Sequence, residues 1–285
     1  MIRNNPYSKK EGPLVGLVST PIGNIEDITL RAINFLKNAD IIACEDTRNT
    51  GLLLSRLGIK PKKLISLYAQ TELKESKRIL TEIIKEKFTL AYCSDAGMPG
   101  ISDPGSLLVK TCYEMNVPVT ILPGPTASLC ALVLSGMDSA DFSFFGFLPT
   151  KQNQIKSFLS ELTKRKETLI FYESPKRLLK TLSIMKEVFK EDRKVSVIRE
   201  LTKIHEEVIS GSLKELTESE IEDRGECILV VEGYQDNEEL DKEEIEKLIK
   251  AGLKEGKTLS SLSKEIALKY KTSKNLVYKI GLSMK

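Results

Sequence analysis

Short apolar runs alternate with amphipathic stretches along most of the chain. The runs LVGLV, IIAC, LISL, LAYC and VPVTIL are nearly continuous in apolar residues, and they predict strands at residues 14–18, 41–44, 64–67, 90–93 and 117–122. Strands without polar alternation are typical of a parallel sheet that helices cover on both faces. Residues 27–37 place Leu30, Ile33 and Leu36 on one helical face, with Asp27 as the expected N-cap. The alternation predicts an α/β domain.

The same alternation resumes after FSFFGFLPTK, residues 142–151. A polar helical stretch is followed by the predicted strands LIFYE, VSVIRE, EEVISG and ECILVVEG, with a helix expected over residues 176–190. We expect a flexible tail over residues 1–13 and a domain boundary near residues 139–149. Residues 14–138 would then form an N-terminal α/β domain, and residues 139–233 a second one.

Charge is distributed unevenly in the last part of the chain. The net charge of +3 is too small to imply a polyanionic partner, but residues 236–246 hold seven acidic residues and one lysine. Residues 250–285 hold nine lysines against Glu255 and Glu265. We interpret residues 234–246 as an acidic linker and residues 247–285 as a small basic helical domain. Its three predicted helices, at residues 242–251, 259–270 and 275–284, have the size of a nucleic-acid-binding module.

Composition excludes several classes of protein. With 41% hydrophobic and 29% charged residues, the chain is expected to fold, and no apolar stretch approaches the ~18–20 residues needed to span a membrane. Basic residues near the N-terminus are not followed by the apolar region expected of a signal peptide. The scattered cysteines lead us to expect a cytoplasmic protein. Five scattered cysteines without a CxxC pair argue for reduced thiols and against zinc, and the single histidine, His205, argues against a histidine-built metal centre or a Ser-His-Asp triad.

Four polar loops follow predicted strands of the first domain. They are STPIGN (19–24), CEDTRNT (44–50), SDAGMPGISDPG (94–105) and PGPTA (123–127). In an open parallel sheet, loops at the carboxyl ends of the strands form the ligand crevice, and glycine lets backbone groups approach a ligand. One such loop could be an ordinary turn, whereas four at one edge indicate a binding site. We expect Asp103 to cap the helix that follows the third loop.

The ligand of this crevice is predicted from its charges. The G-x-G-x-x-G fingerprint of dinucleotide sites is absent, and AGLKEGKT (251–258) resembles a P-loop but follows no predicted strand. The loops carry Asp46, Asp95 and Asp103 but only Arg48 as a base, which suits a neutral or cationic ligand better than a phosphate. S-adenosyl-L-methionine, with its sulfonium and ammonium groups, fits that description.

Two segments of the second domain join strand ends to groups of both charges. In FYESPKR and RELTKIHEE, the residues Glu173, Arg199, Glu200 and Lys203 could orient or deprotonate a hydroxyl group. The alternative is a solvated cluster of self-paired charges.

The chain resembles a known family through seven motifs in order and spacing. TPIGNIEDITLRA, CEDTRNT, SDAGMPGISDPG, PGPTA, GFLPTK, FYESPKR and RELTKIHEE are similar to those of the ribosomal RNA small-subunit methyltransferase I family, whose fold resembles the tetrapyrrole methylases. The similarity runs from about residue 14 to residue 233, and the C-terminal piece resembles the small helix-turn-helix-type domain of many members.

The resemblance implies two α/β domains of the tetrapyrrole methylase type, with S-adenosylmethionine in the cleft between them, in a homodimer. It implies methylation of the ribose 2′-hydroxyl of a cytidine in the 16S rRNA of the small ribosomal subunit. From the composition we expect neither a metal nor a membrane partner. The implied cofactor-binding residues are Thr20, Pro21, Gly23, Ser94, Asp95, Ala96, Gly97, Met98, Pro99, Gly124, Pro125, Thr126 and Ala127. The candidate RNA-binding residues are Arg48, Lys151, Lys176, Arg177, Lys254, Lys257 and Lys274.

Three positions depart from the family pattern. Asn49 and Lys176 stand where the pattern has histidine, and Met98 stands where it has threonine. The stretch YAQTE (68–72) likewise lacks the usual histidine. Because the framework survives these losses, we expect that no histidine is an obligatory base.

A ribose hydroxyl is a poor nucleophile at neutral pH, so a general base should assist the transfer. Our hypothesis from the sequence is that Glu173 or Glu200 accepts the proton while Lys203 and Arg199 hold RNA phosphates. Two other interpretations remain open: a methylase of the same fold that acts on a tetrapyrrole or another small molecule, and a non-catalytic RNA-binding assembly factor. The basic tail argues against the first, since a small substrate needs no such segment.

Overall fold

The computed structural model describes residues 5–6, 12–68, 72–235, 242–270 and 272–284, and most of the predicted tail and part of the acidic linker lie outside these ranges. The chain forms two compact units, Met1–Gly233 and Tyr234–Lys285, which we describe separately.

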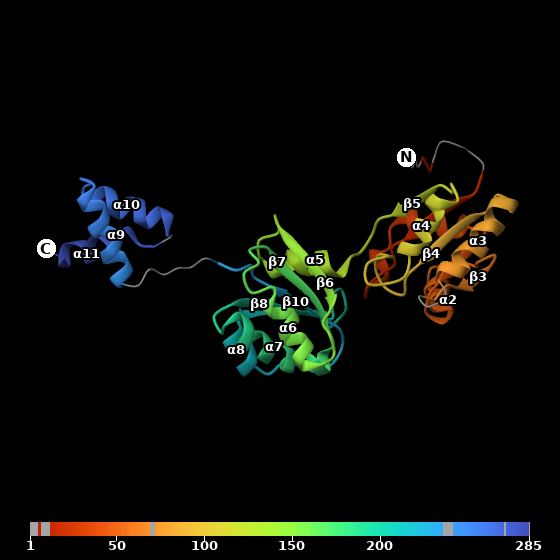
Figure 1. The fold of residues 1–285 in the computed structure, drawn as a ribbon. Coiled ribbons are helices and arrows are strands. Elements are labelled where there is room, and N and C mark those ends of the chain that lie inside the picture. Colours follow the sequence, from red (N-terminus) through yellow and green to blue (C-terminus); the bar gives the residue numbers. More distant parts are fainter. Residues whose placement is uncertain (1–4, 7–11, 69–71, 236–241, 271, 285) are drawn as a thin grey trace. The chain divides into compact units, whose positions relative to one another are not determined.

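The first sheet of the larger unit is entirely parallel. Its strands are β1 (Leu14–Val18), β2 (Ile41–Cys44), β3 (Leu64–Ser66), β4 (Thr89–Cys93) and β5 (Val119–Leu122), in the order β3-β2-β4-β1-β5. Figure 1 labels β3, β4 and β5 of this sheet. Helices α1 (Leu30–Asn38) and α2 (Thr47–Arg56) pack on one face, and α3 (Glu72–Glu86) and α4 (Ser106–Glu114) pack on the other. Apolar clusters fill both faces, which explains why these strands are nearly continuous in apolar residues.

The second sheet is mixed. Its strands β6 (Phe142–Phe147), β7 (Thr168–Glu173), β8 (Lys194–Arg199), β9 (Glu207–Ser212) and β10 (Cys227–Val231) follow the order β6-β7-β10-β8-β9, and only β6 and β7 pair in parallel. Helices α6 (Gln152–Ser160), α7 (Pro175–Phe189) and α8 (Leu213–Glu218) cover one face, and α5 (Ala127–Ser135) covers the other. Helix α5 precedes the predicted boundary near residues 139–149, yet it packs against the second sheet.

Two predicted helix caps are wrong, and in each case another side chain takes the role. Asp27 lies in a 3-10 turn, Ile25–Asp27, and Thr29 caps α1 by accepting a hydrogen bond of 3.1 Å from the amide of Ala32. Asp103 does not cap α4. The carboxylate of Glu72, which comes from helix α3, accepts hydrogen bonds from the amides of Gly105 and Leu108 at 2.9 and 3.0 Å. A buried carboxylate from a distant segment therefore satisfies the amides that a local side chain was expected to bind.

The smaller unit contains the three helices that the sequence predicts: α9 (Lys242–Lys254), α10 (Leu259–Lys269) and α11 (Lys274–Ser283). They share an apolar cluster of their own, which includes Ile249, Ile266 and Val277. The P-loop-like segment forms the end of α9 and the turn into α10, with Gly256 in the left-handed region, so a helix and not a strand leads into it. Within the described residues, no helix has both the length and the apolarity to cross a membrane.

Candidate functional site

A cavity of about 370 Å³ lies between the two sheets of the larger unit. Its walls come from the loop after β4, the start of α5, the bulged end of β6 and the carboxyl end of β7, with further residues near β8 and β10. The first wall, formed by the loop after β4 and the start of α5, contains polar and small residues. The second wall, formed by the strands of the second sheet, contains aromatic and aliphatic residues. The lining includes Ile22, Asp95, Ala96, Gly97, Met98, Ser102, Asp103, Thr126, Ala127, Phe147, Tyr172, Glu173, Ile198, Leu201, Glu226 and Ile228.

Six of the residues predicted to bind the cofactor line this cavity: Asp95, Ala96, Gly97, Met98, Thr126 and Ala127. Behind them, Thr20 joins the first loop to the third. Its backbone exchanges two hydrogen bonds with Gly97, at 2.9 and 3.1 Å, and its hydroxyl donates to the carbonyl of Ser94 at 3.2 Å. The hydroxyl of Ser94 in turn donates to the carbonyl of Gly97 at 2.9 Å. Thr20 and Ser94 therefore fix the shape of the loop, and neither lines the cavity itself.

The remaining predicted cofactor residues, Pro21, Gly23, Pro99, Gly124 and Pro125, also lie outside the lining. The fourth loop joins the first through Pro125, whose carbonyl accepts a hydrogen bond of 3.0 Å from the hydroxyl of Ser19.

Gly97 has a φ of +80°, and a Cβ there would lie 3.1 Å from the side chain of Ile22, so the loops meet closely at this point. Gly23 approaches the second sheet instead, because a Cβ there would lie 2.6 Å from Lys203 Cγ.

The cavity is negatively charged on its first wall. No lysine, arginine or histidine lines it in the part of the chain that the structure describes. Burial, and after it the charges of Glu45 and Asp95, raise the pKa of Asp103 to about 6. Burial, with the charges of Asp95 and Asp46, also raises the pKa of Glu45. A wall of carboxylates that repel one another is a suitable site for a cation.

Asp95 is held in place from the second loop. One of its carboxylate oxygens accepts a hydrogen bond of 3.2 Å from the amide of Asp46, and the other accepts one of 2.9 Å from the side-chain amide of Asn49. Asn49 thus supplies an N–H donor at the position where the family pattern has histidine. Arg48, the one base of these loops, is paired with Asp46 at 2.6 Å, and its hydrogen bonds lower the pKa of Asp46 to about 2. Met98 lines the cavity, but nothing in the structure explains methionine there rather than threonine.

The carboxylate of Glu173 is fully buried and fully hydrogen-bonded. One oxygen accepts from the Arg177 guanidinium, at 2.8 Å from Nε, and from the amide of Ser174 at 2.6 Å. The other accepts from the hydroxyl of Thr181 at 2.7 Å. Side chains alternate along a strand, so Tyr172 faces the cavity while Glu173 points toward helix α7.

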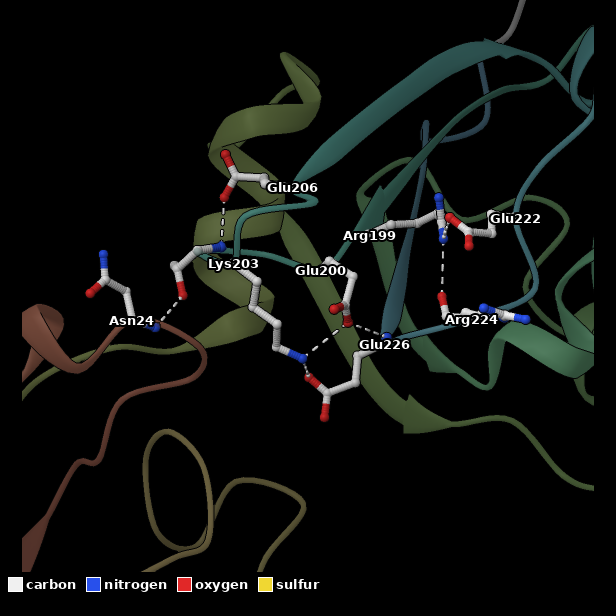
Figure 2. Close-up of polar contacts among 9 residues, drawn as sticks. Asn24, Arg199, Glu200, Lys203, Glu206, Glu222, Arg224 and Glu226 are labelled. Atoms are coloured by element: carbon white, nitrogen blue, oxygen red, sulfur yellow. Dashed lines mark hydrogen bonds and ion pairs between the residues drawn. The ribbon is translucent and has the colours of Figure 1, made fainter. Parts of the chain in front are cut away.

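Arg199 occupies the equivalent position on β8. Ile198 faces the cavity, whereas the buried Arg199 pairs with Glu207 at 2.6 Å. Arg199 also pairs with Glu222 at 3.4 Å and donates to the carbonyl of Arg224 at 3.0 Å, and these three residues are labelled in Figure 2. It lines a separate, acidic hollow with Glu220 and Asp223. Arg199 therefore lies outside the cavity lining, and Glu173, which is part of the lining, has its carboxylate already bound to Arg177, Ser174 and Thr181.

Glu200 and Lys203 form a network at the rim of the cavity (Figure 2). The amine of Lys203 lies 3.0 Å from the carboxylate of Glu200 and 2.9 Å from that of Glu226, which lines the cavity. Burial alone would raise the pKa of Glu200, but hydrogen bonds from Lys203 and from the amide of Glu226 outweigh it and lower the pKa.

The candidate RNA-binding residues differ in whether their charged groups are exposed or already paired with another residue. Lys151 and Lys176 are exposed at the first turns of α6 and α7, whereas Arg177 is bound to Glu173 and to the carbonyls of Leu148 and Pro149. In the smaller unit, Lys254 and Lys274 are exposed, and Lys257 is paired with Glu265 at 3.1 Å and with Glu255 at 3.7 Å.

Sequence reasoning missed the aromatic wall. Phe147 is 65% exposed and lines the cavity, and its ring meets the edge of Tyr172 with centroids 5.4 Å apart. A bulge at Gly146, with a φ of +67°, directs Phe147 into this position. The sequence pattern predicts a domain boundary in this segment, and the aromatic-rich run FSFFGF is the signal in it that points to the aromatic wall.

Comparison with known proteins supports an enzymatic interpretation of the cavity. Residues 15–217 match the family model described as Tetrapyrrole (Corrin/Porphyrin) Methylases. The chain is 40% identical over 274 residues to the ribosomal RNA small subunit methyltransferase I of Haemophilus influenzae, a match that covers 94% of this chain and 95% of the relative. It is 45% identical over 238 residues to the Bacillus subtilis protein of the same name, with 83% and 80% covered.

Solved structures of similar fold are more distant in sequence. The uroporphyrin-III-C-methyltransferase of Thermus thermophilus is 20% identical, with a TM-score of 0.52 over 78% of this chain and 92% of that one. Diphthine synthase is 16% identical, with a TM-score of 0.59 over 77% of this chain and 90% of that one. These two likenesses concern the fold alone.

Proposed function

The chain belongs to the ribosomal RNA small subunit methyltransferase I family, within the tetrapyrrole methylases, and from that premise we propose that it methylates the ribose 2′-hydroxyl of a cytidine in 16S rRNA. The methyl donor is S-adenosylmethionine, as in the family, and we propose that it binds in the cavity between the two sheets.

The observation that carries the proposal is the charge of the cavity wall. Asp95 and Asp103 line it, Glu45 acts on Asp103 through its charge, and no cationic side chain of the described residues opposes them there. These residues fit a ligand that carries positive charge on sulfur and nitrogen. When bound, the donor supplies a methyl group on a sulfonium, which is already activated for displacement.

The chain's main task is then alignment and exclusion of water. Thr20 and Ser94 hold the third loop in one shape, and Asn49 holds Asp95, so that backbone groups and a carboxylate are presented in a fixed arrangement. Ile198, Leu201 and Ile228 supply an apolar wall opposite them that excludes water.

We assign Glu173 and Arg199 positioning roles in place of direct chemistry. Each is buried and committed to partners on its own side of the second sheet, so each fixes a strand end that borders the cavity. The Lys203 ion pair gives Glu200 a lowered pKa, which makes it a weak base. Lys203 itself is partly exposed at the rim and remains our candidate for a contact with an RNA phosphate.

The rim also offers a surface for a nucleobase. Proteins that recognise single-stranded RNA stack unpaired bases on aromatic side chains. Phe147 presents such a ring at the cavity, supported by Tyr172, and we propose that it stacks a base near the reacting ribose. The exposed Lys151 and Lys176 and the lysines of the smaller unit would add phosphate contacts.

We further propose that the protein acts in the cytoplasm as a homodimer. Val133 and Leu129 on α5 and Ile121 on the edge strand β5 are exposed apolar side chains, of the kind that a second copy could cover. Sedimentation velocity would test this: a monomer at micromolar concentration would contradict it.

Methyl transfer from labelled donor to unmodified small ribosomal subunits tests the function. We expect label on one cytidine of 16S rRNA, in a form that resists alkaline cleavage of the following phosphodiester, because a 2′-O-methyl group blocks that reaction. Label on a base, or no transfer to the subunit, would contradict the proposal. Transfer to a tetrapyrrole in its place would favour the small-molecule alternative.

A further inference from the structure

Helix α11 of the smaller unit buries one side and exposes the other. Val277, Ile280 and Gly281 are buried, and Gly281 leaves no room for a Cβ against the side chain of Leu259 on α10. This close approach fixes which side of the helix points outward. The outward side carries the exposed residues Lys274, Asn275, Tyr278, Lys279 and Leu282, which we call the α11 face.

The α11 face has a strip of uncharged side chains with one lysine on each side. At about 100° per residue, Asn275, Tyr278 and Leu282 lie within about 60° of one another around the helix axis. Lys274 lies about 40° beyond Tyr278 on one side, and Lys279 lies about 40° beyond Asn275 on the other. Tyr278 and Leu282 are 40% and 50% exposed, so a helix presents the ring and the aliphatic chain to solvent.

The positive charge of the α11 face is not compensated by nearby acids. Helix α11 contains no aspartate or glutamate, and Lys274 and Lys279 form no ion pair with any residue that the structure describes. The acidic side chains described in this unit lie near the start of α9 or, as Glu255 and Glu265, beside Lys257. The two exposed amines therefore favour an anionic partner, and a polyanion is able to contact both at once.

We propose that the α11 face binds an unpaired segment of the RNA substrate, an inference that rests on the proposed function. The ring of Tyr278 stacks on a base, and Lys274 and Lys279 contact the flanking phosphates. Asn275 offers a side-chain amide that both donates to and accepts from a base edge. Leu282 extends the apolar surface beside the ring.

The side chains of the α11 face fit unpaired RNA better than a duplex. The major groove of A-form RNA is deep and narrow, so side chains do not read it, and a duplex is recognised mainly through its phosphates and ribose hydroxyls. Lysines alone would serve that purpose, and an exposed ring between them would contribute little. Unpaired bases, in contrast, stack on aromatic side chains whatever their sequence, because every base has an aromatic face.

A protein partner fits the α11 face less well. Such a partner would bury Lys274 and Lys279 and would have to supply a carboxylate to each, because burial of an unpaired charge is costly. An RNA strand carries an anion with every nucleotide, so the contact that stacks a base also neutralises the lysines.

The α11 face belongs to a different compact unit from the cavity, so it should contribute affinity and not chemistry. Two binding modules on one chain make the second contact intramolecular, which raises the effective concentration of the substrate at the first. Substitutions in the α11 face should therefore raise KM for small subunits and leave kcat and the Kd for the donor unchanged.

A fluorescence titration of the full chain tests the stacking contact. The chain contains no tryptophan, so Tyr278→Trp places a single fluorescent reporter in the α11 face. The probes are a single-stranded oligoribonucleotide of about 12 nucleotides, chosen without self-complementarity, and the duplex that it forms with its complement. We expect the single strand to quench the emission through base stacking and the duplex to leave it unchanged. Phe142→Trp, an aromatic exchange at an exposed position outside the cavity lining, is the matched control and should respond to neither probe.

Loss of the ring should weaken binding of the single strand selectively. For Tyr278→Leu we expect the Kd of the single strand to rise by about 5–150-fold, the range for loss of one stacked base, with the Kd of the duplex unchanged. Tyr278→Trp should restore the affinity, because its ring also stacks. Lys279→Gln should reduce the salt slope of binding by about 1. Its matched control is Lys250→Gln on α9, an exposed lysine without an ion pair to a described residue, which should leave the slope unchanged.

Three results would overturn the proposal. Emission of Tyr278→Trp that does not respond to the single strand would exclude a stacked base at this position. Equal quenching by the duplex would show that the α11 face does not select unpaired RNA. Unchanged RNA binding by Tyr278→Leu, together with a lower sedimentation coefficient, would make the face a contact between copies of the chain. Failure of the proposed function is distinguishable from all three, because the quenching would then persist in a protein that does not methylate the small subunit.

Discussion

The backbone amide of Asn24 donates a hydrogen bond of 3.0 Å to the hydroxyl of Thr202, a residue 178 positions along the chain (Figure 2). This contact joins the first loop of the first sheet to the turn after β8 in the second. Thr202 has a φ of +64°, and Glu206 holds its amide at 2.6 Å. Ile22 and Leu201, next to the two partners, line the cavity from opposite sheets. The contact therefore sets the spacing of the cavity walls.

Gly23→Ala should disturb this spacing. A Cβ at this position would lie 2.6 Å from Lys203 Cγ and 2.8 Å from the carbonyl oxygen of Leu201, so the two loops must move apart. We expect a loss of about 1–3 kcal/mol in the free energy of unfolding and weaker binding of S-adenosylmethionine, measured by denaturant titration and calorimetry. Gly51→Ala is the matched control, because the nearest atom to a Cβ in that helix lies 4.0 Å away. The prediction would be contradicted if Gly23→Ala and Gly51→Ala had the same free energy of unfolding and the same affinity for S-adenosylmethionine.

Glu173→Gln should act mainly on stability. The change removes the carboxylate charge that pairs with Arg177. It leaves a neutral side-chain amide at a buried position where the surrounding groups donate hydrogen bonds to an anion. We expect a loss of about 2–3 kcal/mol, less than for a fully buried pair because Arg177 is partly exposed.

Glu187→Gln provides the control for this variant, since its pair with Lys156 is exposed and should contribute no more than about 0.5 kcal/mol. If folded Glu173→Gln lost turnover by orders of magnitude at unchanged stability, the positioning role would be untenable and Glu173 would return as a candidate base.

Phe147→Leu should weaken the binding of the RNA substrate. Loss of one stacked base costs about 1–3 kcal/mol, so KM for small subunits should rise by about 5–150-fold while the Kd for the donor is unchanged. Phe142→Leu, an exposed change in the same strand but outside the cavity lining, should have no such effect. An increase in donor Kd for Phe147→Leu would indicate that the ring contacts the cofactor instead.

The smaller unit should provide affinity that depends on salt. Removing residues 240–285 is expected to weaken RNA binding and flatten its salt dependence, with donor binding unchanged, because phosphate contacts release counterions. Among single variants, Lys254→Gln and Lys274→Gln should each reduce the slope by about 1 if they contact phosphates. Lys257→Gln should have a smaller effect, because Glu255 and Glu265 already neutralise that lysine. A slope that does not change on truncation would exclude a role for this unit in RNA binding.

Much of the fold could be predicted from the hydrophobic pattern. The strands at residues 14–18 and 41–44 were located at their observed ends, and the three C-terminal helices were placed within a few residues. Local pattern is sufficient there because each element buries its own apolar face. The strand Phe142–Phe147 was missed, because a bulged edge strand with a glycine in it has no regular alternation.

The sequence by itself determined which polar loops share one edge of the parallel sheet, since the carboxyl ends of parallel strands point the same way, and it determined that these loops are acidic. Only the tertiary structure decided which carboxylates are already paired. Glu173 and Glu200 differ from Asp103 in their partners, and those partners come from strand registers and turns that local sequence does not specify. Even the helix cap expected of Asp103 went to Glu72, 33 residues before Gly105, which leaves the Asp103 carboxylate in the cavity. Burial and hydrogen bonding depend on residues far apart in the chain, so the chemistry of a side chain is settled only when they meet.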